Sequence, residues 1–141
     1  MSFFYLSDKP EDMQFSRIVE LLRTTYWAGE RAESVIRLSM EHSLCFGAFL
    51  SENGRQIAFA RAITDFASTF YLCDVIVDAA YRGRGVGRAL VGAIVSDERI
   101  SHLRGLLATR DAHALYQPFG FCVDTERLME RKPTRNPLPR G

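Results

Sequence analysis

The stretch Val75-Ile76-Val77-Asp78-Ala79-Ala80-Tyr81-Arg82-Gly83-Arg84-Gly85-Val86-Gly87-Arg88-Ala89-Leu90 decides the fold of this chain. Its pattern is that of an apolar strand, a short polar elbow, a turn rich in glycine and arginine, and the start of an apolar-periodic helix. This order brings backbone N–H groups, a helix N-terminus and three guanidinium groups to one small volume. Such a turn is suited to bind a phosphate or a pyrophosphate.

The composition is that of an ordinary globular protein. The chain has 141 residues, of which 47% are hydrophobic and 25% charged, with a formal net charge of +1. We predict one domain over residues 1–131 and a proline-rich tail over 132–141. The near-neutral charge argues against a nucleic-acid partner. Without a signal-like or membrane-spanning run we expect no membrane partner and a cytoplasmic location. The three cysteines form no Cys-x-x-Cys pair, so we expect reduced thiols and no metal site.

Helical and strand periods divide the rest of the chain. Helical spacing predicts helices from Phe15 to Tyr26 and over 30–41, 85–97 and 112–118. Strand patterns predict strands over 2–6, 45–50, 56–64, 69–77 and 103–109, and a final strand or hairpin over 120–129. The Asn53-Gly54 pair is a hairpin signal, so the three central strands should form an antiparallel meander. The strand–helix–strand unit that follows should be parallel and right-handed.

Other phosphate-binding motifs fit the glycine-rich turn less well. A P-loop requires a lysine that the turn lacks. A dinucleotide fingerprint requires a third glycine where Arg88 stands, and it follows the first strand of a βαβ unit. The remaining alternative is a glycine-rich connection with a solvated arginine cluster.

Two motifs resemble the GNAT superfamily of acyl-CoA-dependent N-acyltransferases. Arg82-Gly83-Arg84-Gly85-Val86-Gly87 matches the family's Arg/Gln-x-x-Gly-x-Gly/Ala motif. Ala114-Leu115-Tyr116-Gln117-Pro118-Phe119-Gly120-Phe121 resembles its Leu-Tyr-x-x-x-Gly-Phe segment. The resemblance covers residues 3–131. It implies an α/β fold of three layers: a mixed, mostly antiparallel sheet of six to seven strands, with helices on both faces and a splay between the fourth and fifth strands.

The resemblance also implies acetyl-CoA as the cofactor. In the family, the amides of the turn bind the pyrophosphate of coenzyme A, and the pantetheine arm pairs with the end of the fourth strand. A backbone N–H near Val75 or Ile76 would polarise the thioester carbonyl, as an oxyanion hole does. Carried over to this sequence, the cofactor-binding residues are Val75, Ile76, Val77, Arg82, Gly83, Arg84, Gly85, Val86, Gly87 and Arg88.

Catalytic residues follow partly from the resemblance. Tyr116 matches the family's general acid, which gives a proton to the departing thiolate; a tyrosine packed on the sheet is the structural alternative. Asp74 interrupts an apolar run, and a buried carboxylate needs a partner or a purpose, so it is either the general base or a partner of a neighbouring strand or loop. The family's frequent glutamate on this strand falls at Tyr71, which is not acidic. Asp111 and His113 are weaker candidates for the base.

The first two helices and their connection would border the acceptor. Tyr26, Trp27 and Glu30 lie there, and Asp65 lies on the strand connection opposite. Aromatic and carboxylate groups can receive a cationic amine, although core packing and a solvated helix start explain these residues equally well. The leading hypothesis is an N-acetyltransferase that acts on a small-molecule or peptide amine by direct attack in a ternary complex. The alternative is a CoA-binding or regulatory module of the same fold with little or no turnover. Homodimers are common in the family, which makes a second copy a candidate partner.

Overall fold

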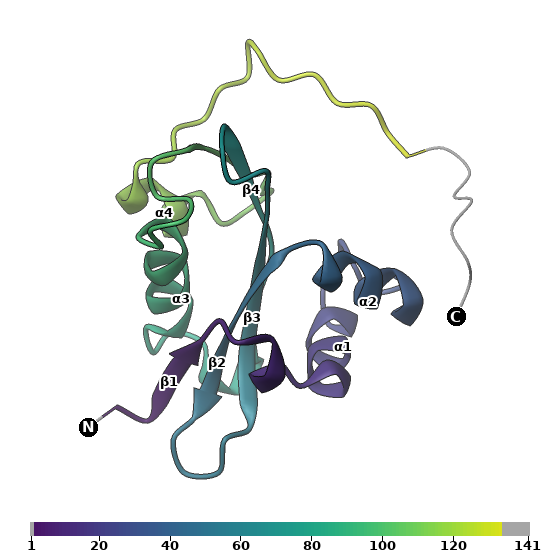
Figure 1. The fold of residues 1–141 in the computed structure, drawn as a ribbon, viewed down its shortest axis with the longest axis vertical. Helices are drawn as coiled ribbons and strands as arrows, with labels where there is room; N and C mark the ends of the chain where they lie inside the picture. The colour runs from purple at the N-terminus through teal and green to yellow at the C-terminus, as the bar shows by residue number, and fades with distance from the viewer. Residues whose placement is uncertain (1, 134–141) are drawn as a thin grey trace.

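A five-stranded sheet forms the middle layer of the computed structural model, which describes residues 2–133 (Figure 1). The strands follow one another in chain order: β1 (Phe4–Ser7), β2 (Leu44–Leu50), β3 (Gln56–Thr64), β4 (Thr69–Val77) and β5 (Arg104–Leu106). Neighbouring strands from β1 to β4 are antiparallel, whereas β5 runs parallel to β4. The sheet is therefore mixed and mostly antiparallel, as predicted.

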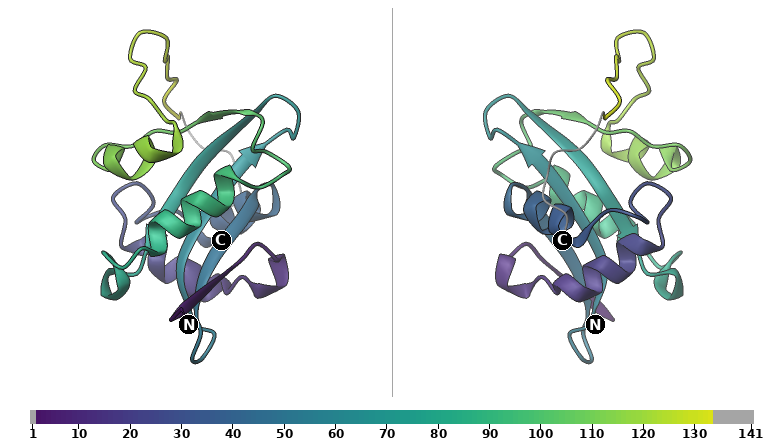
Figure 2. Two further views of the ribbon diagram at one scale, coloured as in Figure 1. Left: turned by 90° about the vertical axis from the view of Figure 1, so that its left-hand side faces the viewer. Right: turned by 90° about the vertical axis from the view of Figure 1, so that its right-hand side faces the viewer.

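Helices cover both faces of the sheet (Figures 1 and 2). The helices α1 (Phe15–Arg23) and α2 (Glu33–Glu41) lie on one face, and α3 (Val86–Val95) and the short α4 (His113–Tyr116) lie on the other. Single turns of 3-10 helix occur at η1 (Pro10–Asp12), η2 (Ala79–Tyr81) and η3 (Gln117–Phe119). None of the helices within residues 2–133 has the length and apolar content needed to cross a membrane.

Each face of the sheet has its own apolar core, because side chains alternate along a strand. Leu90 and Ile94 of α3 are fully buried on one face, and Ile18 of α1 and Ile36 of α2 are fully buried on the other. Truncating one such side chain, as in Leu90→Ala, costs about 2–5 kcal/mol of stability. Residues of β4 belong to both cores, which fixes this strand between the two helical layers.

A β-bulge interrupts the pairing of β4 with β3. The pairs Phe59–Ile76 and Arg61–Cys73 bracket it, so three steps along β4 oppose two along β3. Asp74 lies in the bulge with a φ of 55°, which is uncommon for a residue other than glycine. Even-numbered residues of β4 face the α3 core before the bulge and the core of α1 and α2 after it. Bulges re-aim side chains and end pairing, and they are frequent beside active sites.

The strands β4 and β5 stay together over a short distance. Their pairing covers Thr69–Tyr71 of β4 and Arg104–Leu106 of β5. From Leu72 to Val77, no strand within residues 2–133 pairs with β4 on this side. The predicted splay between the fourth and fifth strands is therefore present, and it leaves the second half of β4 with an open edge.

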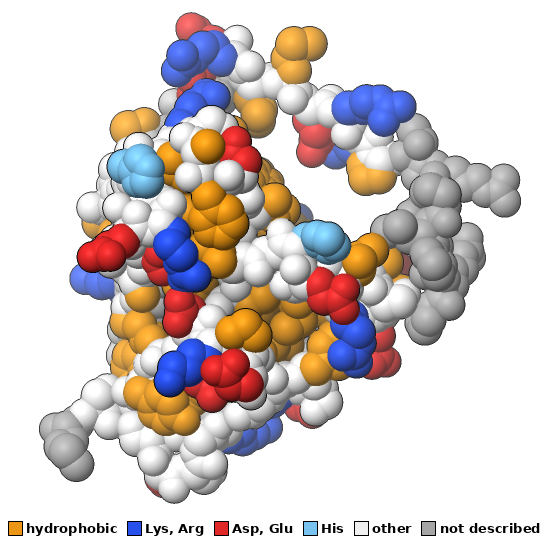
Figure 3. Space-filling view, in the orientation of Figure 1, with side chains coloured by type: hydrophobic (Ala, Val, Ile, Leu, Met, Phe, Trp, Pro, Cys, Tyr) orange, Lys and Arg blue, Asp and Glu red, His pale blue; other side chains and the backbone are white. Residues whose placement is uncertain are grey.

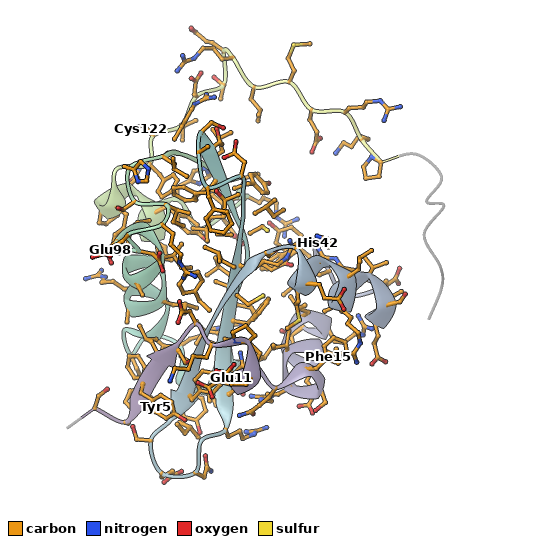
Figure 4. All side chains as sticks on the ribbon, in the orientation of Figure 1. Tyr5, Glu11, Phe15, His42, Glu98 and Cys122 are labelled. Carbon is orange, nitrogen blue, oxygen red and sulfur yellow. The ribbon has the colours of Figure 1, made fainter. Side chains whose placement is uncertain are left out.

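The predicted count of six to seven strands is wrong, because residues 120–129 form no strand. The Asp124 carboxylate accepts hydrogen bonds from the backbone N–H groups of Glu126 and Arg127, both at 3.3 Å, and a local turn replaces the extended strand. Residues 123–133 stand away from the body of the protein and carry charges of both signs (Figures 3 and 4). Residues 134–141 of the predicted tail lie outside the described residues, and the domain boundary at 131 stays a prediction.

The remaining elements match the sequence prediction in kind. The strands β3 and β4 have the predicted bounds, and β2 begins one residue earlier than predicted. The predicted helices from Phe15 to Tyr26 and over 30–41 and 85–97 are shorter at their ends, and the strand predicted over 103–109 spans only β5. The helix predicted over 112–118 is divided into α4 and η3, because a proline follows the first turn.

Candidate active site

The turn between β4 and α3 is built to expose backbone N–H groups. Asp78 accepts a hydrogen bond from the Ala80 N–H at 2.9 Å, and its other oxygen accepts one from the Arg17 guanidinium, which fixes the elbow after β4. Gly83 and Gly85 then adopt φ values of 74° and 87°, and an added Cβ at either would meet nothing within 4 Å. In the described part of the chain, the N–H groups of residues 82–88 find no acceptor.

A cavity of about 480 Å³ lies directly over this turn. Its lining residues are Val77, Tyr81, Arg82, Gly83, Gly85, Val86, Gly87, Arg88 and Leu115. Most of the predicted cofactor-binding residues therefore line one hollow at the N-terminus of α3. The positive end of the helix dipole and the guanidinium groups make this hollow favourable for an anion.

Arg84 differs from its two neighbouring arginines. Its guanidinium lies 3.9 Å from the ring centre of Phe3, and it lines an adjoining cavity of about 430 Å³ together with Phe3, Glu52 and Tyr81. Arg82 instead donates a hydrogen bond from Nε to the Val77 carbonyl at 3.1 Å, at the end of β4. The Arg84 side chain therefore points to the adjoining cavity, and only its backbone N–H could contact a group bound in the hollow over the turn.

The strand residues predicted to hold the cofactor arm lie along the open edge of β4. Val75 and Val77 are partly buried and pack toward the α3 core, whereas Ile76 is 7% exposed and packs toward α1 and α2. Asp74 and Val75 have no register partner on β3 because of the bulge, and β5 ends before it reaches them. The β4 backbone at Asp74 and Val75 therefore lacks a register partner on either side.

Tyr116 lies at the end of α4 and belongs to the core on the α3 side of the sheet. Its side chain is 8% exposed and packs edge-on against Phe121, with ring centres 6.1 Å apart. Burial, with a smaller contribution from the nearby Tyr26 phenol, raises the pKa of Tyr116 to about 12. Within residues 2–133 its hydroxyl has no hydrogen-bond partner, yet no buried polar side-chain atom is left unpartnered, so the oxygen touches accessible space. The hydroxyl is protonated at neutral pH and free to donate.

Asp74 is a buried carboxylate with three donors around it. Its Oδ2 accepts hydrogen bonds from Arg31 Nη1 and Arg61 Nε, both at 2.7 Å, and its Oδ1 accepts one from Trp27 Nε1 at 3.1 Å. Burial alone would raise the pKa of Asp74, but the hydrogen bonds and charges of Arg31 and Arg61 outweigh burial and hold the pKa below its ordinary value. This arrangement favours the structural alternative, a partner of a neighbouring strand and loop, over a proton acceptor.

The aromatic residues predicted for the acceptor site come together with Tyr116 and Asp74. Tyr26 and Trp27 contact each other edge-on with ring centres 5.0 Å apart, and the Arg110 guanidinium lies 3.8 Å from the Tyr26 ring centre. Arg110 follows β5, whereas Tyr26 follows α1, so this contact joins the two sides of the gap. Their exposed fractions of 56% and 42% leave Tyr26 and Trp27 open to a ligand.

The two predicted acidic residues of the acceptor site do not join this cluster. Asp65 accepts hydrogen bonds from the backbone N–H groups of Ala67 and Ser68 and from the Ser68 hydroxyl, which shapes its own turn. The Ser68 side chain first, and then these backbone donors, lower the pKa of Asp65. Glu30 is exposed and forms no ion pair within residues 2–133. Asp111 and His113 are also exposed, close to Tyr116 in the chain.

Sequence reasoning missed Arg61 and Arg110. Arg61 lies in β3 with an apolar residue on each side of it in the sequence. This position indicates that it pairs with the lone carboxylate of the next strand, Asp74. Arg110 gave no such signal, because its contact with Tyr26 depends on two loops distant in the sequence.

Comparisons with known proteins agree with this geometry. The family model for the acetyltransferase (GNAT) domain matches residues 42–123. The crystal structure of a GNAT-family acetyltransferase from Xanthomonas campestris pv. campestris is 38% identical, with a TM-score of 0.87 over 94% of this chain and 95% of that chain. The ribosomal-protein-S18-alanine N-acetyltransferase of Escherichia coli shares the fold, with a TM-score of 0.68 and 24% identity over 86% of this chain and 79% of that chain.

A plant relative is also similar in sequence. Serotonin N-acetyltransferase 2, chloroplastic, of Oryza sativa subsp. japonica is 32% identical over 104 residues, which is 70% of this chain and 52% of that protein. The chain thus spans about half the length of this curated relative. The glycine turn, the open edge of β4 and Tyr116 all fall within the matched residues 42–123. On these grounds the chain belongs to the GNAT family of acetyltransferases.

Proposed function

We propose that this protein is an N-acetyltransferase that moves an acetyl group from acetyl-CoA to a primary amine. The observation that carries the proposal is the cavity of about 480 Å³ over the glycine turn, whose free N–H groups adjoin the open edge of β4. A long carrier with an anionic diphosphate head and an arm that pairs like a strand fits these two features together.

The residues present fit acetyl-CoA. The N–H groups of residues 83–88, with the side chains of Arg82 and Arg88, would bind the diphosphate. The edge from Val75 to Val77 would pair with the amide groups of the arm. When bound, acetyl-CoA would supply the acetyl group as a thioester.

The chemistry proposed for the chain is direct attack with Tyr116 as the general acid. The amine nitrogen forms a bond to the thioester carbon, the carbon–sulfur bond breaks, and the Tyr116 hydroxyl gives its proton to the departing thiolate. The two thiols near Asp74 do not favour a covalent acyl-enzyme, because burial raises the pKa of Cys45 and of Cys73 to about 11 and leaves little thiolate. The proton of the amine would leave to water or to a group such as Asp111 or His113 rather than to Asp74, and the Tyr116 phenolate would regain its proton from water.

The acceptor would lie against Tyr26 and Trp27. Exposed aromatic rings attract a cationic amine, and they also stack on an amine substrate that carries an aromatic ring. The rice relative is named for serotonin and the bacterial one for a protein N-terminal alanine, so serotonin and an alanine-terminated peptide belong in an acceptor panel beside polyamines. A cytoplasmic location and a homodimer remain parts of the proposal.

Thermal denaturation followed by an acceptor screen tests this function. At a concentration of 100 Kd, acetyl-CoA should stabilise the protein by about 2.7 kcal/mol, whereas ATP, NAD and oligonucleotides should not. Release of free thiol with at least one amine of the panel then identifies the enzyme. A shift without thiol release for any amine would favour the alternative, a CoA-binding or regulatory module. An absent shift would contradict both.

A further inference from the structure

Asp74 combines an unusual backbone with an unusual set of partners. It holds a φ of 55° inside the β4 bulge, at 6% exposure, and its carboxylate accepts from Trp27, Arg31 and Arg61. A non-glycine residue with positive φ persists only where its surroundings fix it. Here three donors from two directions fix the side chain, and the side chain in turn fixes the bulge.

The three donors come from two parts of the fold, the strand β3 and the connection from α1 to α2. Arg61 lies on β3 and also donates to the Ser43 hydroxyl at 3.1 Å, which anchors the carboxylate to the sheet. Trp27 and Arg31 lie on the connection from α1 to α2, the side where the acceptor would lie. The Asp74 carboxylate therefore links the connection from α1 to α2, beside which the acceptor would lie, to the β4 backbone next to Val75.

We propose that Asp74 is a positioning residue, which holds the bulge so that a backbone N–H near Val75 points into the gap between β4 and β5 toward the thioester carbonyl. The inference depends on the proposed function, because it concerns how that reaction is activated. It differs from a general base in that the carboxylate stays ionised and paired throughout. Donors aimed at a developing oxyanion contribute strongly to acyl transfer, and small displacements of them are costly.

An infrared experiment without an acceptor isolates this role. Acetyl-CoA labelled with ¹³C at the carbonyl is bound to the protein, and the carbonyl stretch is compared with that of the free thioester. Wild-type protein should shift the band to lower frequency, because an N–H donor polarises the carbonyl. Asp74→Asn should lose most of this shift and lower kcat by on the order of 10²-fold, with little change in the affinity for acetyl-CoA.

Asp97→Asn is the matched control, because Asp97 also accepts from an arginine, Arg99 at 2.7 Å, but lies beyond the far end of α3. With this variant, the carbonyl band of bound acetyl-CoA and the value of kcat should equal those measured with the wild type. If Asp74→Asn does not fold, Arg31→Met replaces it, since Arg31 is partly exposed and its loss should remove part of the shift. A full band shift in Asp74→Asn, or in Arg31→Met when that variant is used, overturns the proposal.

The same measurements separate this inference from the proposed function. If wild-type protein fails to bind labelled acetyl-CoA, the proposed function fails. If wild-type protein binds and shifts the band but the variant shifts it equally, only the role of Asp74 fails.

Discussion

Tyr116 is the residue whose change most directly tests the proposed chemistry. Tyr116→Phe removes one oxygen that forms no hydrogen bond within residues 2–133, so the fold should be unaffected. Because general-acid help contributes about 10²–10⁴-fold to a rate, kcat should fall within that range while the affinity for acetyl-CoA stays constant. Steady-state kinetics and a binding titration measure the two quantities.

Tyr26→Phe is the control for this variant, because Tyr26 is 56% exposed and also a phenol. It should change the KM for the acceptor more than kcat. Unchanged turnover in Tyr116→Phe would remove Tyr116 from the mechanism and leave its raised pKa as a result of burial alone.

Asp74 should also make stability depend on pH. Its pKa in the folded protein lies below the ordinary value, so the ionised carboxylate stabilises the fold above a pH of about 3.9, and this stability is lost as the pH falls through the lower folded value. Asp74→Asn leaves two cations without their partner and should reduce the free energy of unfolding by about 3 kcal/mol at pH 7. The loss on acidification should be smaller in the variant than in the wild type.

Urea unfolding at pH 7 and pH 3 checks this expectation. Asp111→Asn serves as the control, because Asp111 is exposed and forms no ion pair in the described part of the chain. Equal stabilities of wild type and Asp74→Asn at pH 7 would show that the buried pairs are not formed in solution.

At the scale of the element, the turn from β4 to α3 requires glycine where its backbone is left-handed. Gly85 caps α3 with a φ of 87°, where an L-residue costs about 1–2 kcal/mol, so Gly85→Ala should destabilise the protein by that amount and weaken acetyl-CoA binding. Gly92 lies inside α3, and an added Cβ would lie 3.5 Å from the Phe119 ring, an ordinary contact. Gly92→Ala should therefore stabilise the protein by up to about 1 kcal/mol and leave binding unchanged.

Chemical denaturation of the two variants, together with acetyl-CoA titration, compares the same substitution inside and outside the turn. Stabilisation by Gly85→Ala would contradict the left-handed conformation of this residue. Tight binding by a destabilised Gly85→Ala would show that the turn does not contact the diphosphate.

The sequence predicts elements well where local pattern decides them. The meander from 44 to 77 has its predicted bounds to within one residue, because Asn53-Gly54 and the apolar runs specify the pairing locally. The bulge was not predicted, since an almost continuous apolar run hides a change in which face each residue points to. Most of the lining of the hollow lies in one continuous motif around the glycines, whereas the partners of Asp74 depend on a loop that is 43 residues away at Arg31 and 47 at Trp27.

At the scale of the whole molecule, the sheet between the two helical layers is open at the gap between β4 and β5, here called the seam. The seam arises because β5 ends at Leu106 while β4 continues to Val77. The hollow over the glycine turn lies at the end of β4, next to Val77, and Arg110 in the loop after β5 contacts Tyr26 in the connection after α1. The strand or hairpin predicted over 120–129 is absent, because this charged segment forms its own turn at Asp124.

The segment from Cys122 to Pro133 is exposed and contributes little to the stability of the fold. Its apolar residues Val123, Leu128 and Met129 are 64%, 70% and 93% exposed, and its ion pairs, Arg127 with Asp124 and Lys132 with Glu130, are local. Exposed local pairs of this kind contribute little to stability. A chain ending at residue 123 should therefore keep its melting temperature within about 3 °C, since such a shift corresponds to less than about 1 kcal/mol.

Differential scanning calorimetry and size-exclusion chromatography of the full and shortened chains measure the outcome. Both chains should elute at the same oligomeric state, and acetyl-CoA should stabilise both equally, because the hollow over the turn contains no residue beyond Leu115. A large drop in melting temperature that depends on protein concentration would contradict this prediction. In that case Leu128 and Met129, which only the full chain carries, would be buried against a second copy in solution, and the segment would belong to a subunit interface.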